Sequence, residues 1–429
     1  MTIRRDLYLD MLKNRMHNGM IKIITGMRRC GKSVLLFNLF YNYLLESGVD
    51  ENHIIAINLE DVGNYDYREP QKLYDYLCSR IKPVGQYYVF LDEVQYAISQ
   101  NDLQSEEPLP LYGVLNGLLH KMNVDVYVTG SNSRFLSSDV RTEFRGRGDE
   151  IHVQPLSFAE FMSVYEGDKY EGLRDYITYG GLPQTTFMKT HEQKAAYLTN
   201  LFEETYIKDV VDRYGIRRNA TEFSELVDIL SSAIGSLSNP TKLSNTFKSV
   251  KNKTVAQVTI ARYISYLEDS FLIDEAAQYD VKGKKYINSP KKYYFTDLGL
   301  RNARLNFRQI EETHLMENVI FNELKLRGYS VDVGVIEKRE KSEDGKSLRK
   351  RYEIDFVANQ GYKRYYIQSA LSMPNLEKEQ QEQRSLTGVN DSFKKIIIVG
   401  TQTITHYNES GILIMGIHDF LLKKDSLDI

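Results

Sequence analysis

The segment Gly26-Met27-Arg28-Arg29-Cys30-Gly31-Lys32-Ser33 constrains the fold more than any other in this chain. It fits the pattern G-x-x-x-x-G-K-[ST], which average residue usage produces by chance roughly 0.01–0.02 times in a chain of this length. A β-branched run, "IKIIT", precedes the segment, and an apolar run, "KSVLLFNLF", follows it. The order predicts a strand, a turn and a helix, with backbone N–H groups and the helix N-terminus facing the phosphates of a bound nucleotide.

The other parts of a nucleotide site are expected in fixed places. In this pattern Lys32 reaches the β- and γ-phosphates, and the Ser33 hydroxyl is a ligand of Mg²⁺. The run "YYVFLDEVQ" ends an apolar strand in Asp92 and Glu93. We expect Asp92 to hold Mg²⁺ through water and Glu93 to polarise the attacking water. All eight residues of the glycine-rich segment are therefore predicted to contact ATP, with Mg²⁺ as the cofactor.

Two further features lie at the end of the run "VDVYVTGSNS" and after it. Asn132 is expected between the attacking water and the γ-phosphate, whereas Ser131 fits a helix cap equally well. The segment "DVRTEFRGRGDEIHV" then carries Arg141, Arg145 and Arg147. An arginine placed just before the next strand could reach a γ-phosphate in its own subunit or in a neighbour. A solvated basic loop is the alternative interpretation of these three arginines.

The spacing of apolar runs predicts an α/β fold with several domains. A chain of 429 residues is too long for one ordinary domain. Within 1–155, helical stretches alternate with five short apolar runs, "IKIITG", "HIIAINLED", "YYVFLDE", "VDVYVTG" and "DEIHVQPL", which is typical of a parallel sheet. A helical region is expected over 156–235. Two helices and a hairpin over 236–305 have the order of a winged helix. A small α/β unit is expected over 306–429, in which "KREKSEDGKSLRKR" is interpreted as a solvated hairpin loop.

Several motifs together resemble one family. The segments "GMRRCGKS", "FLDEVQ", "VTGSNS" and "GRGDEIHVQPLSFAEF" are similar to the prokaryotic AAA-type ATPases that carry a C-terminal domain of unknown function. The segments "YITYGGLPQ" and "KKYYFTDLGLRNA" resemble further hallmarks of that family, so the resemblance covers nearly the whole chain. It implies an ASCE-type ATPase core, a winged-helix region and a C-terminal fold like the restriction endonucleases. It also implies that Arg147 is the arginine finger.

The endonuclease-like segment departs from the pattern of an active nuclease. Two carboxylates hold Mg²⁺ in such a site, and a lysine orients or activates water. Glu317 and Asp355 occupy the carboxylate positions, but Gln368 replaces an acid, and Ala370 stands where the lysine belongs. A degenerate structural domain, a DNA-binding remnant and a working nuclease remain as alternatives, and the missing lysine disfavours the last.

The stretch from 242 to 292 is locally basic, with ten Lys or Arg against five Asp or Glu. Five of these lysines lie around the predicted hairpin: Lys282, Lys284, Lys285, Lys291 and Lys292. Duplex DNA could bind there through its phosphates, above all at the first three. Winged helices also dock proteins, so a protein partner is the alternative.

Composition excludes several classes of protein. The two cysteines form no disulfide framework, and the eight histidines lack the spacing of a zinc site. No apolar run approaches the ~18–20 residues that span a bilayer. We therefore expect a cytoplasmic protein with no membrane partner.

These observations predict an ATP-hydrolysing enzyme. It is expected to act as a nucleotide switch on DNA or on a protein partner, and it could form a homo-oligomer. An ATP-regulated endonuclease of a defence system and an ATP-binding scaffold with negligible turnover are the alternatives.

Overall fold

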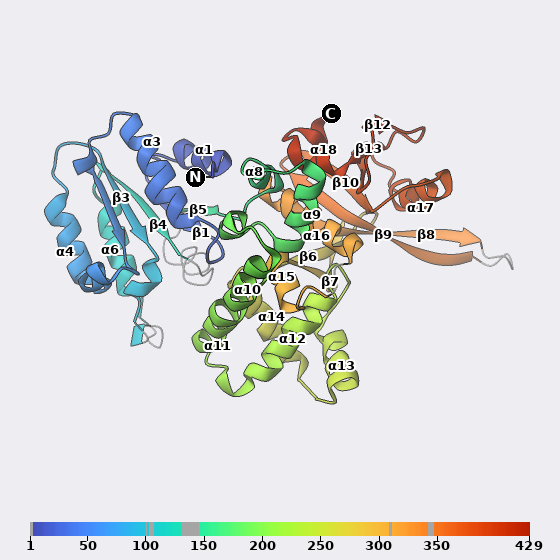
Figure 1. The fold of residues 1–429 in the computed structure, drawn as a ribbon, viewed down its shortest axis with the longest axis horizontal. Coiled ribbons are helices and arrows are strands. Elements are labelled where there is room, and N and C mark those ends of the chain that lie inside the picture. The colour runs from blue at the N-terminus through green and yellow to red at the C-terminus, as the bar shows by residue number, and fades with distance from the viewer. Residues whose placement is uncertain (1–2, 100, 103–106, 131–145, 309–310, 342–346) are drawn as a thin grey trace. The chain divides into compact units, whose positions relative to one another are not determined.

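The computed structural model describes residues 3–99, 101–102, 107–130, 146–308, 311–341 and 347–429 (Figure 1). Their contacts divide the chain into two compact units. The first contains residues 1–155 and 269–271, and the second contains residues 156–268 and 272–429. None of the described helices combines the length and the apolar character needed to cross a bilayer.

The first unit contains a five-stranded parallel sheet with the order β2-β3-β4-β1-β5. The strands are β1 (Ile21–Thr25), β2 (Ile54–Asn58), β3 (Tyr87–Asp92), β4 (Val124–Thr129) and β5 (Gly148–His152). The three middle strands are almost entirely buried because helices cover both faces. The predicted α/β fold with a P-loop type parallel sheet is confirmed.

Helices pack on both faces of this sheet (Figure 1). On one face, α4 (Pro70–Arg80) and α6 (Pro110–Leu119) share an apolar core with alternate residues of β1, β2, β3 and β4. The other face meets the helix that follows β1, where Phe40 contacts Phe90 and Tyr127 at ring-centroid distances of 5.7 and 4.9 Å. This helix comprises α2 (Lys32–Val34), a π-helical stretch (Leu35–Phe40) and α3 (Tyr41–Glu46), and α1 (Asp6–Asn14) packs beside it.

The second unit begins with helices and ends with a mixed sheet. Its helices are α8 (Phe158–Met162), α9 (Lys169–Tyr179), α10 (His191–Leu201), α11 (Lys208–Arg213), α12 (Ala220–Ser232), α13 (Pro240–Lys251), α14 (Gln257–Asp269), α15 (Leu298–Arg304), α16 (Glu312–Leu326), α17 (Leu376–Leu386) and α18 (Ile417–Leu422). Its strands are β6 (Ile273–Asp280), β7 (Lys285–Phe295), β8 (Ser330–Lys341), β9 (Ser347–Gln360), β10 (Lys363–Ala370), β11 (Lys394–Val399), β12 (His406–Tyr407) and β13 (Leu413–Gly416). They form one sheet with the order β12-β13-β11-β10-β9-β8-β6-β7.

This single sheet joins the two segments that were expected as a winged-helix domain and an endonuclease-like domain. The hairpin of β6 and β7 is hydrogen-bonded to β8 through parallel pairs from Gln278 to Asp280. The longest hairpin, β8 with β9, keeps its antiparallel register out to Lys341 and Ser347. The solvated loop predicted over "KREKSEDGKSLRKR" is therefore wrong at 338–341 and 347–351, which are strand, and its tip, 342–346, lies outside the described residues. Ladder pairing continues there because backbone hydrogen bonds between antiparallel strands do not depend on the polarity of the side chains.

A buried carboxylate links the segments "YITYGGLPQ" and "KKYYFTDLGLRNA". Asp297 precedes α15 and accepts hydrogen bonds from the N–H groups of Leu300, at 3.0 Å, and Gly181, at 2.8 Å. Asn302 donates to two carbonyls at the end of α9, those of Ile177 and Thr178. A side chain at position 299 would place its Cβ 2.0 Å from the carbonyl oxygen of Tyr179, so only glycine fits there. We call these contacts the Asp297 cluster.

Candidate functional site

The glycine-rich segment forms a tight turn between β1 and α2. Gly26 has a φ of 140°, and a Cβ added there would lie 2.2 Å from the carbonyl oxygen of Val153. The side chains of Met27 and Cys30 are buried and anchor the turn. Arg29 is exposed and has a left-handed φ of 63°. The turn therefore keeps its backbone at the carboxyl edge of the sheet, where α/β proteins bind ligands.

Two cations hold this turn in place. The ammonium of Lys32 is buried and donates to the carbonyls of Gly26 and Met27, each at 3.0 Å. Arg5, which sequence reasoning missed, donates to the carbonyls of Cys30, at 2.9 Å, and Gln154, at 2.7 Å. Arg5 thus ties the turn to the end of β5. An arginine just before the first helix gave no signal of this role, because its partners are backbone carbonyls far along the chain.

A hydrogen-bonded group of polar side chains faces the turn from the end of β3. Asp92 accepts hydrogen bonds from the hydroxyls of Ser33 and Thr129. Burial raises the pKa of the Asp92 carboxyl, and these two hydrogen bonds, followed by the charge of Lys32, oppose the rise. A buried carboxylate beside a serine hydroxyl offers two oxygen ligands of the kind that Mg²⁺ prefers. The donor set therefore fits the predicted cofactor.

Thr129 is the second residue that sequence reasoning missed. It ends β4, which lies directly beside β3 in the sheet, so its hydroxyl meets Asp92 although the two residues are 37 positions apart. A polar residue at the end of a buried strand was the available signal.

Glu93 has an unusual backbone conformation. Its φ of 53° is left-handed, which costs a non-glycine residue about 1 kcal/mol or more. The Glu93 N–H donates to the Thr129 hydroxyl at 3.0 Å, and its carboxylate accepts a hydrogen bond from the amide of Gln95. Backbone strain that the surroundings hold in place is typical of functional sites.

The other predicted residues of this site are separated from it or lie outside the described residues. Ser131, Asn132, Arg141 and Arg145 lie outside the described residues. Arg147 is exposed and precedes β5, and its carbonyl accepts a hydrogen bond from Ile21 N–H, at 2.9 Å. Ile21 begins β1, whereas the glycine-rich turn follows the end of β1. At about 3.3 Å per strand residue, Arg147 lies roughly 16 Å from the turn of its own subunit.

The second unit contains a separate buried group of charges. Lys292 of β7 lies between Glu317 of α16, at 2.8 Å, and Glu353 of β9, at 2.7 Å. The Tyr294 hydroxyl also donates to Glu317, at 2.6 Å. Asp355 accepts a hydrogen bond from the N–H of Ser369 at 2.8 Å. The structure thus gathers the two carboxylates predicted for a nuclease-like fold around a lysine that comes from the neighbouring hairpin.

The charged residues around Lys292, which are Glu317, Glu353 and Asp355, form with it what we call the Lys292 group, and charges within the group shift the pKa values of Lys292 and Asp355. Burial lowers the pKa of Lys292, but Glu317, Asp355 and Glu353 together raise it above its ordinary value. Burial and then the charge of Glu317 raise the pKa of Asp355. Gln368 accepts a hydrogen bond from Ser385, and Ala370 is buried. Over the described part of the chain, no group of three or more His, Cys, Asp or Glu side chains is arranged to hold a metal ion.

The five lysines of the β6–β7 hairpin have different environments. Lys282, Lys284 and Lys285 are exposed at its turn. Lys291 is partly buried and pairs with both carboxylate oxygens of Glu275, at 2.5 and 2.6 Å. Lys292 is buried in the charge group described above. The basic surface expected at this hairpin is therefore limited to its turn.

Comparisons with known proteins give two matching domains and two relatives of nearly the same length. Residues 18–162 match an AAA domain, and residues 170–311 match a domain of unknown function (DUF8612). An uncharacterised protein of Haemophilus influenzae is 31% identical over 98% of this chain and 99% of its own length. An uncharacterised protein of Methanocaldococcus jannaschii is 26% identical over 95% of this chain and 86% of its own.

One solved structure that this chain matches is the Walker-type ATPase PABY2304 of Pyrococcus abyssi. It is 16% identical to this chain, with a TM-score of 0.49, and the match covers 71% of this chain and 96% of that one. The match to the Haemophilus protein covers nearly the whole chain. The AAA domain and the domain of unknown function follow one another within that match. The chain therefore belongs to a family of AAA-type ATPases in which the P-loop domain is followed by a domain of unknown function.

Proposed function

We propose that this protein is a Mg²⁺-dependent ATPase that acts as a nucleotide switch on duplex DNA or on a protein partner. The observation that carries the proposal is the hydrogen-bonded chain from Ser33 to Asp92 to Thr129 to the Glu93 backbone. It joins the helix after the glycine-rich turn to the ends of two neighbouring strands. A structural turn would not need a buried carboxylate, a buried ammonium and a strained glutamate in one place.

The residues of the glycine-rich turn would bind the phosphates of ATP. Backbone N–H groups between Gly26 and Gly31 and the N-terminus of α2 supply uncharged donors. The Lys32 ammonium lies on two loop carbonyls and can exchange them for phosphate oxygens, which are stronger acceptors because they are charged. Ser33 and Asp92 would hold Mg²⁺, which neutralises charge on the phosphates when it is bound.

Glu93 would serve as the base that orients and polarises water. The Gln95 amide donates a hydrogen bond to its carboxylate, and its backbone N–H donates to the Thr129 hydroxyl. These two contacts fix the orientation of the side chain. Asn132 is proposed to contact the same water, as the sequence suggests. Arg147 would stabilise charge on the transferred phosphoryl group, and its place at the far end of β5 requires that it act on a neighbouring subunit.

Two substitutions separate binding from hydrolysis. Lys32→Ala should abolish ATP binding because the buried charge at the phosphates is lost. Glu93→Gln should keep ATP binding and lose turnover because only the activation of water is removed. Nucleotide binding by calorimetry and phosphate release with Mg²⁺ measure the two steps. Wild-type turnover in Glu93→Gln would refute the assignment of the base, and negligible turnover in the wild type would favour an ATP-binding scaffold.

The Lys292 group is proposed to be structural and not a nuclease site. The support is that the Lys292 ammonium already pairs with Glu317, one of the two carboxylates that would hold Mg²⁺, while Ala370 stands in place of the usual lysine. Labelled duplex DNA incubated with the protein, ATP and Mg²⁺ or Mn²⁺ should stay intact. Cleavage that disappears in Asp355→Ala would instead support the ATP-regulated endonuclease.

A further inference from the structure

The β8–β9 hairpin forms a ribbon with an unusual arrangement of charge. Lys338 is directly opposite Lys350 in the register, and like charges in that position are destabilising. Both ammonium groups lie over the ring of Tyr352, at 5.4 and 5.7 Å from its centroid. The Lys338 ammonium also donates to the carbonyl of Arg384, at 2.6 Å, so part of the repulsion is relieved within the protein. Two cations this close still form a positively charged site that attracts anions.

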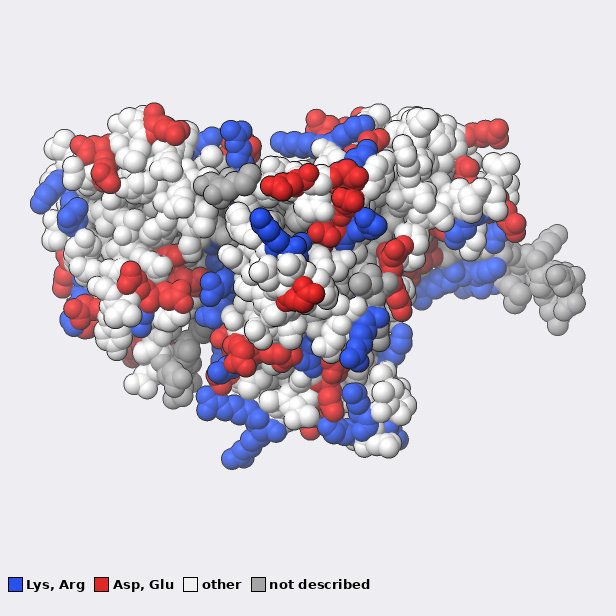
Figure 2. Space-filling model, viewed as in Figure 1, with Lys and Arg blue, Asp and Glu red and all other residues white. Residues whose placement is uncertain are grey.

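Cations occupy both faces of this ribbon. Successive side chains of a strand point to opposite faces, so Arg349 and Arg351 lie on the face opposite to Lys350. All three are exposed. Figure 2 shows Lys and Arg atoms in a continuous band along the ribbon, on the side in view. A patch that binds a flat anionic surface needs cations on one face only. A ribbon that lies in a groove between two phosphate backbones needs cations on both faces.

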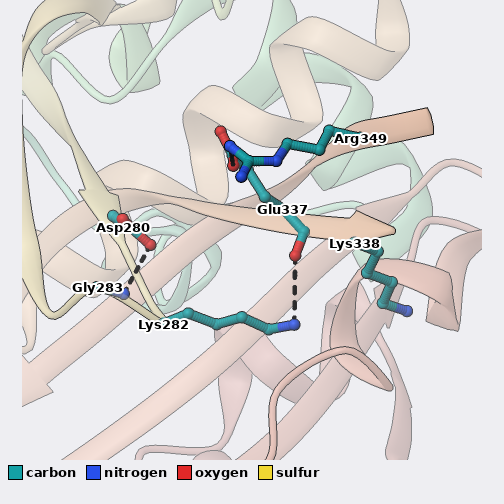
Figure 3. A pocket seen from close by; sticks show the side chains of 6 residues that line it. All are labelled: Asp280, Lys282, Gly283, Glu337, Lys338 and Arg349. Atoms are coloured by element: carbon teal, nitrogen blue, oxygen red, sulfur yellow. Dashed lines mark hydrogen bonds and ion pairs between the residues drawn. The ribbon is translucent and has the colours of Figure 1, made fainter. Parts of the chain in front are cut away.

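The turn of the β6–β7 hairpin adds to the same surface. The ammonium of Lys282 reaches across to β8 and donates to the carbonyl of Glu337, at 3.3 Å (Figure 3). A hollow of about 280 Å³ lies between the turn and the ribbon. Its lining residues are Asp280, Lys282, Gly283, Glu337, Lys338 and Arg349. Asp280 accepts a hydrogen bond from the Gly283 N–H, and the Glu337 carboxylate lies 4.0 Å from Arg349, so both acids already have partners within the hollow.

Of the two helices of the expected winged helix, α13 carries the exposed Lys242, Lys248 and Lys251, whereas α14 provides a weaker surface. The exposed positions of α14 are Gln257, Val258, Ala261, Arg262 and Ser265, which include one cation. A recognition helix that binds phosphates usually carries several. The ribbon is therefore a better candidate than α14 for an anionic partner.

We infer that the β8–β9 ribbon and the adjoining β6–β7 turn bind duplex DNA, with the ribbon along the major groove and Lys282 on a flanking phosphate. The inference rests on the proposed function, since it identifies the partner of the switch. The major groove of B-DNA admits a two-stranded β-ribbon, whereas the major groove of A-form RNA is too narrow. Contacts through phosphates make the binding largely independent of base sequence.

The test measures binding of a labelled mixed-sequence DNA duplex to the full chain over a series of salt concentrations. The ribbon variant combines Lys282→Gln, Arg349→Gln and Lys350→Gln. The matched control combines Lys248→Gln, Lys251→Gln and Arg262→Gln, which removes three exposed cations from α13 and α14. Each phosphate contact contributes about 0.9 to the slope of log affinity against log salt. The ribbon variant should therefore lose up to about 2.7 from the slope, while the control keeps the wild-type slope.

Several outcomes would overturn the inference. These are an unchanged slope in the ribbon variant, an equal loss in the control, equal affinity for an RNA duplex, and equally effective competition by polyglutamate, which would indicate a protein-docking surface. Thermal unfolding of both variants should match the wild type, because the six side chains are exposed. ATP turnover is measured in the same samples. Turnover without DNA binding refutes the DNA surface alone, and DNA binding without turnover refutes the proposed ATPase alone.

Discussion

At the scale of single residues, Lys292 shows how a buried charge depends on its partners. Its side chain is 4% exposed and touches two carboxylates, while Asp355 lies close enough to raise its pKa. A buried ion pair contributes little net stability compared with apolar residues of the same size, but removing one partner leaves an uncompensated charge. The group therefore stabilises the second unit only while it is complete.

Lys292→Met should lower the free energy of unfolding by roughly 3–5 kcal/mol at neutral pH, because Glu317 and Glu353 lose their counter-charge. The loss should shrink as the pH falls, since the carboxylates of the variant can then take up protons. Urea unfolding followed by fluorescence measures both effects. Lys291→Met is the matched control, because its ion pair with Glu275 is partly exposed and should contribute at most about 1 kcal/mol. Equal losses in the two variants would contradict the account of the buried group.

The residues that the sequence could suggest are those that a short motif brings together. Lys32 and Ser33 belong to one turn, and Asp92 ends an apolar strand, so their types and places were predictable. Thr129, Arg5 and Lys292 act through partners that are 25 or more positions away along the chain. Those contacts depend on the order of the strands and on the pairing of the two hairpins. A local sequence pattern shows neither the order nor the pairing.

At the scale of elements, the Asp297 cluster joins α9 to α15. Asp297 is buried among backbone N–H groups, and burial raises its pKa to about 6 although these hydrogen bonds lower it. Strand and helix positions in this unit followed apolar periodicity closely. The β8–β9 ribbon did not follow this periodicity, because a charged sequence of this kind is typical of a loop. Its strand structure comes from hydrogen bonding between the two arms of the hairpin.

The pH dependence of stability tests the Asp297 cluster. Between the ordinary aspartate pKa of 3.8, which applies to the unfolded chain, and the raised value of about 6, the folded state holds more protons at Asp297 than the unfolded state does. The free energy of unfolding should therefore fall as the pH rises through that window, by about 3 kcal/mol for this group. Asp297→Asn should remove that component, which urea midpoints measured from pH 4 to 7 would show.

Asp168→Asn is the control for this measurement. Asp168 also caps a helix, but hydrogen bonds from the N–H groups of Glu171 and Tyr170 lower its pKa. Its contribution to stability is present above the unfolded pKa and is lost as the pH falls, which is the opposite sign. An unchanged pH profile in Asp297→Asn would show that the carboxyl titrates normally.

At the scale of the whole molecule, the two ends of one sheet have different proposed tasks. The glycine-rich turn and Asp92 lie at the carboxyl ends of the strands, and Arg147 lies at the amino end of β5. A side chain extends a few ångströms, so it does not cover the roughly 16 Å of strand between them. An arginine finger at this position is useful only if a second subunit brings its own nucleotide site to it.

A mixing experiment tests this arrangement. Arg147→Ala should lower kcat by about 10³-fold or more with little change in ATP affinity, because a finger stabilises charge only in the transition state. Lys32→Ala cannot bind ATP but keeps its arginine, so mixing these two inactive variants should restore part of the turnover. Arg145→Ala is the control, and a larger loss there would move the assignment by two residues. If Arg147→Ala is inactive but the mixture stays inactive although the subunits associate, Arg147 does not act across a subunit boundary.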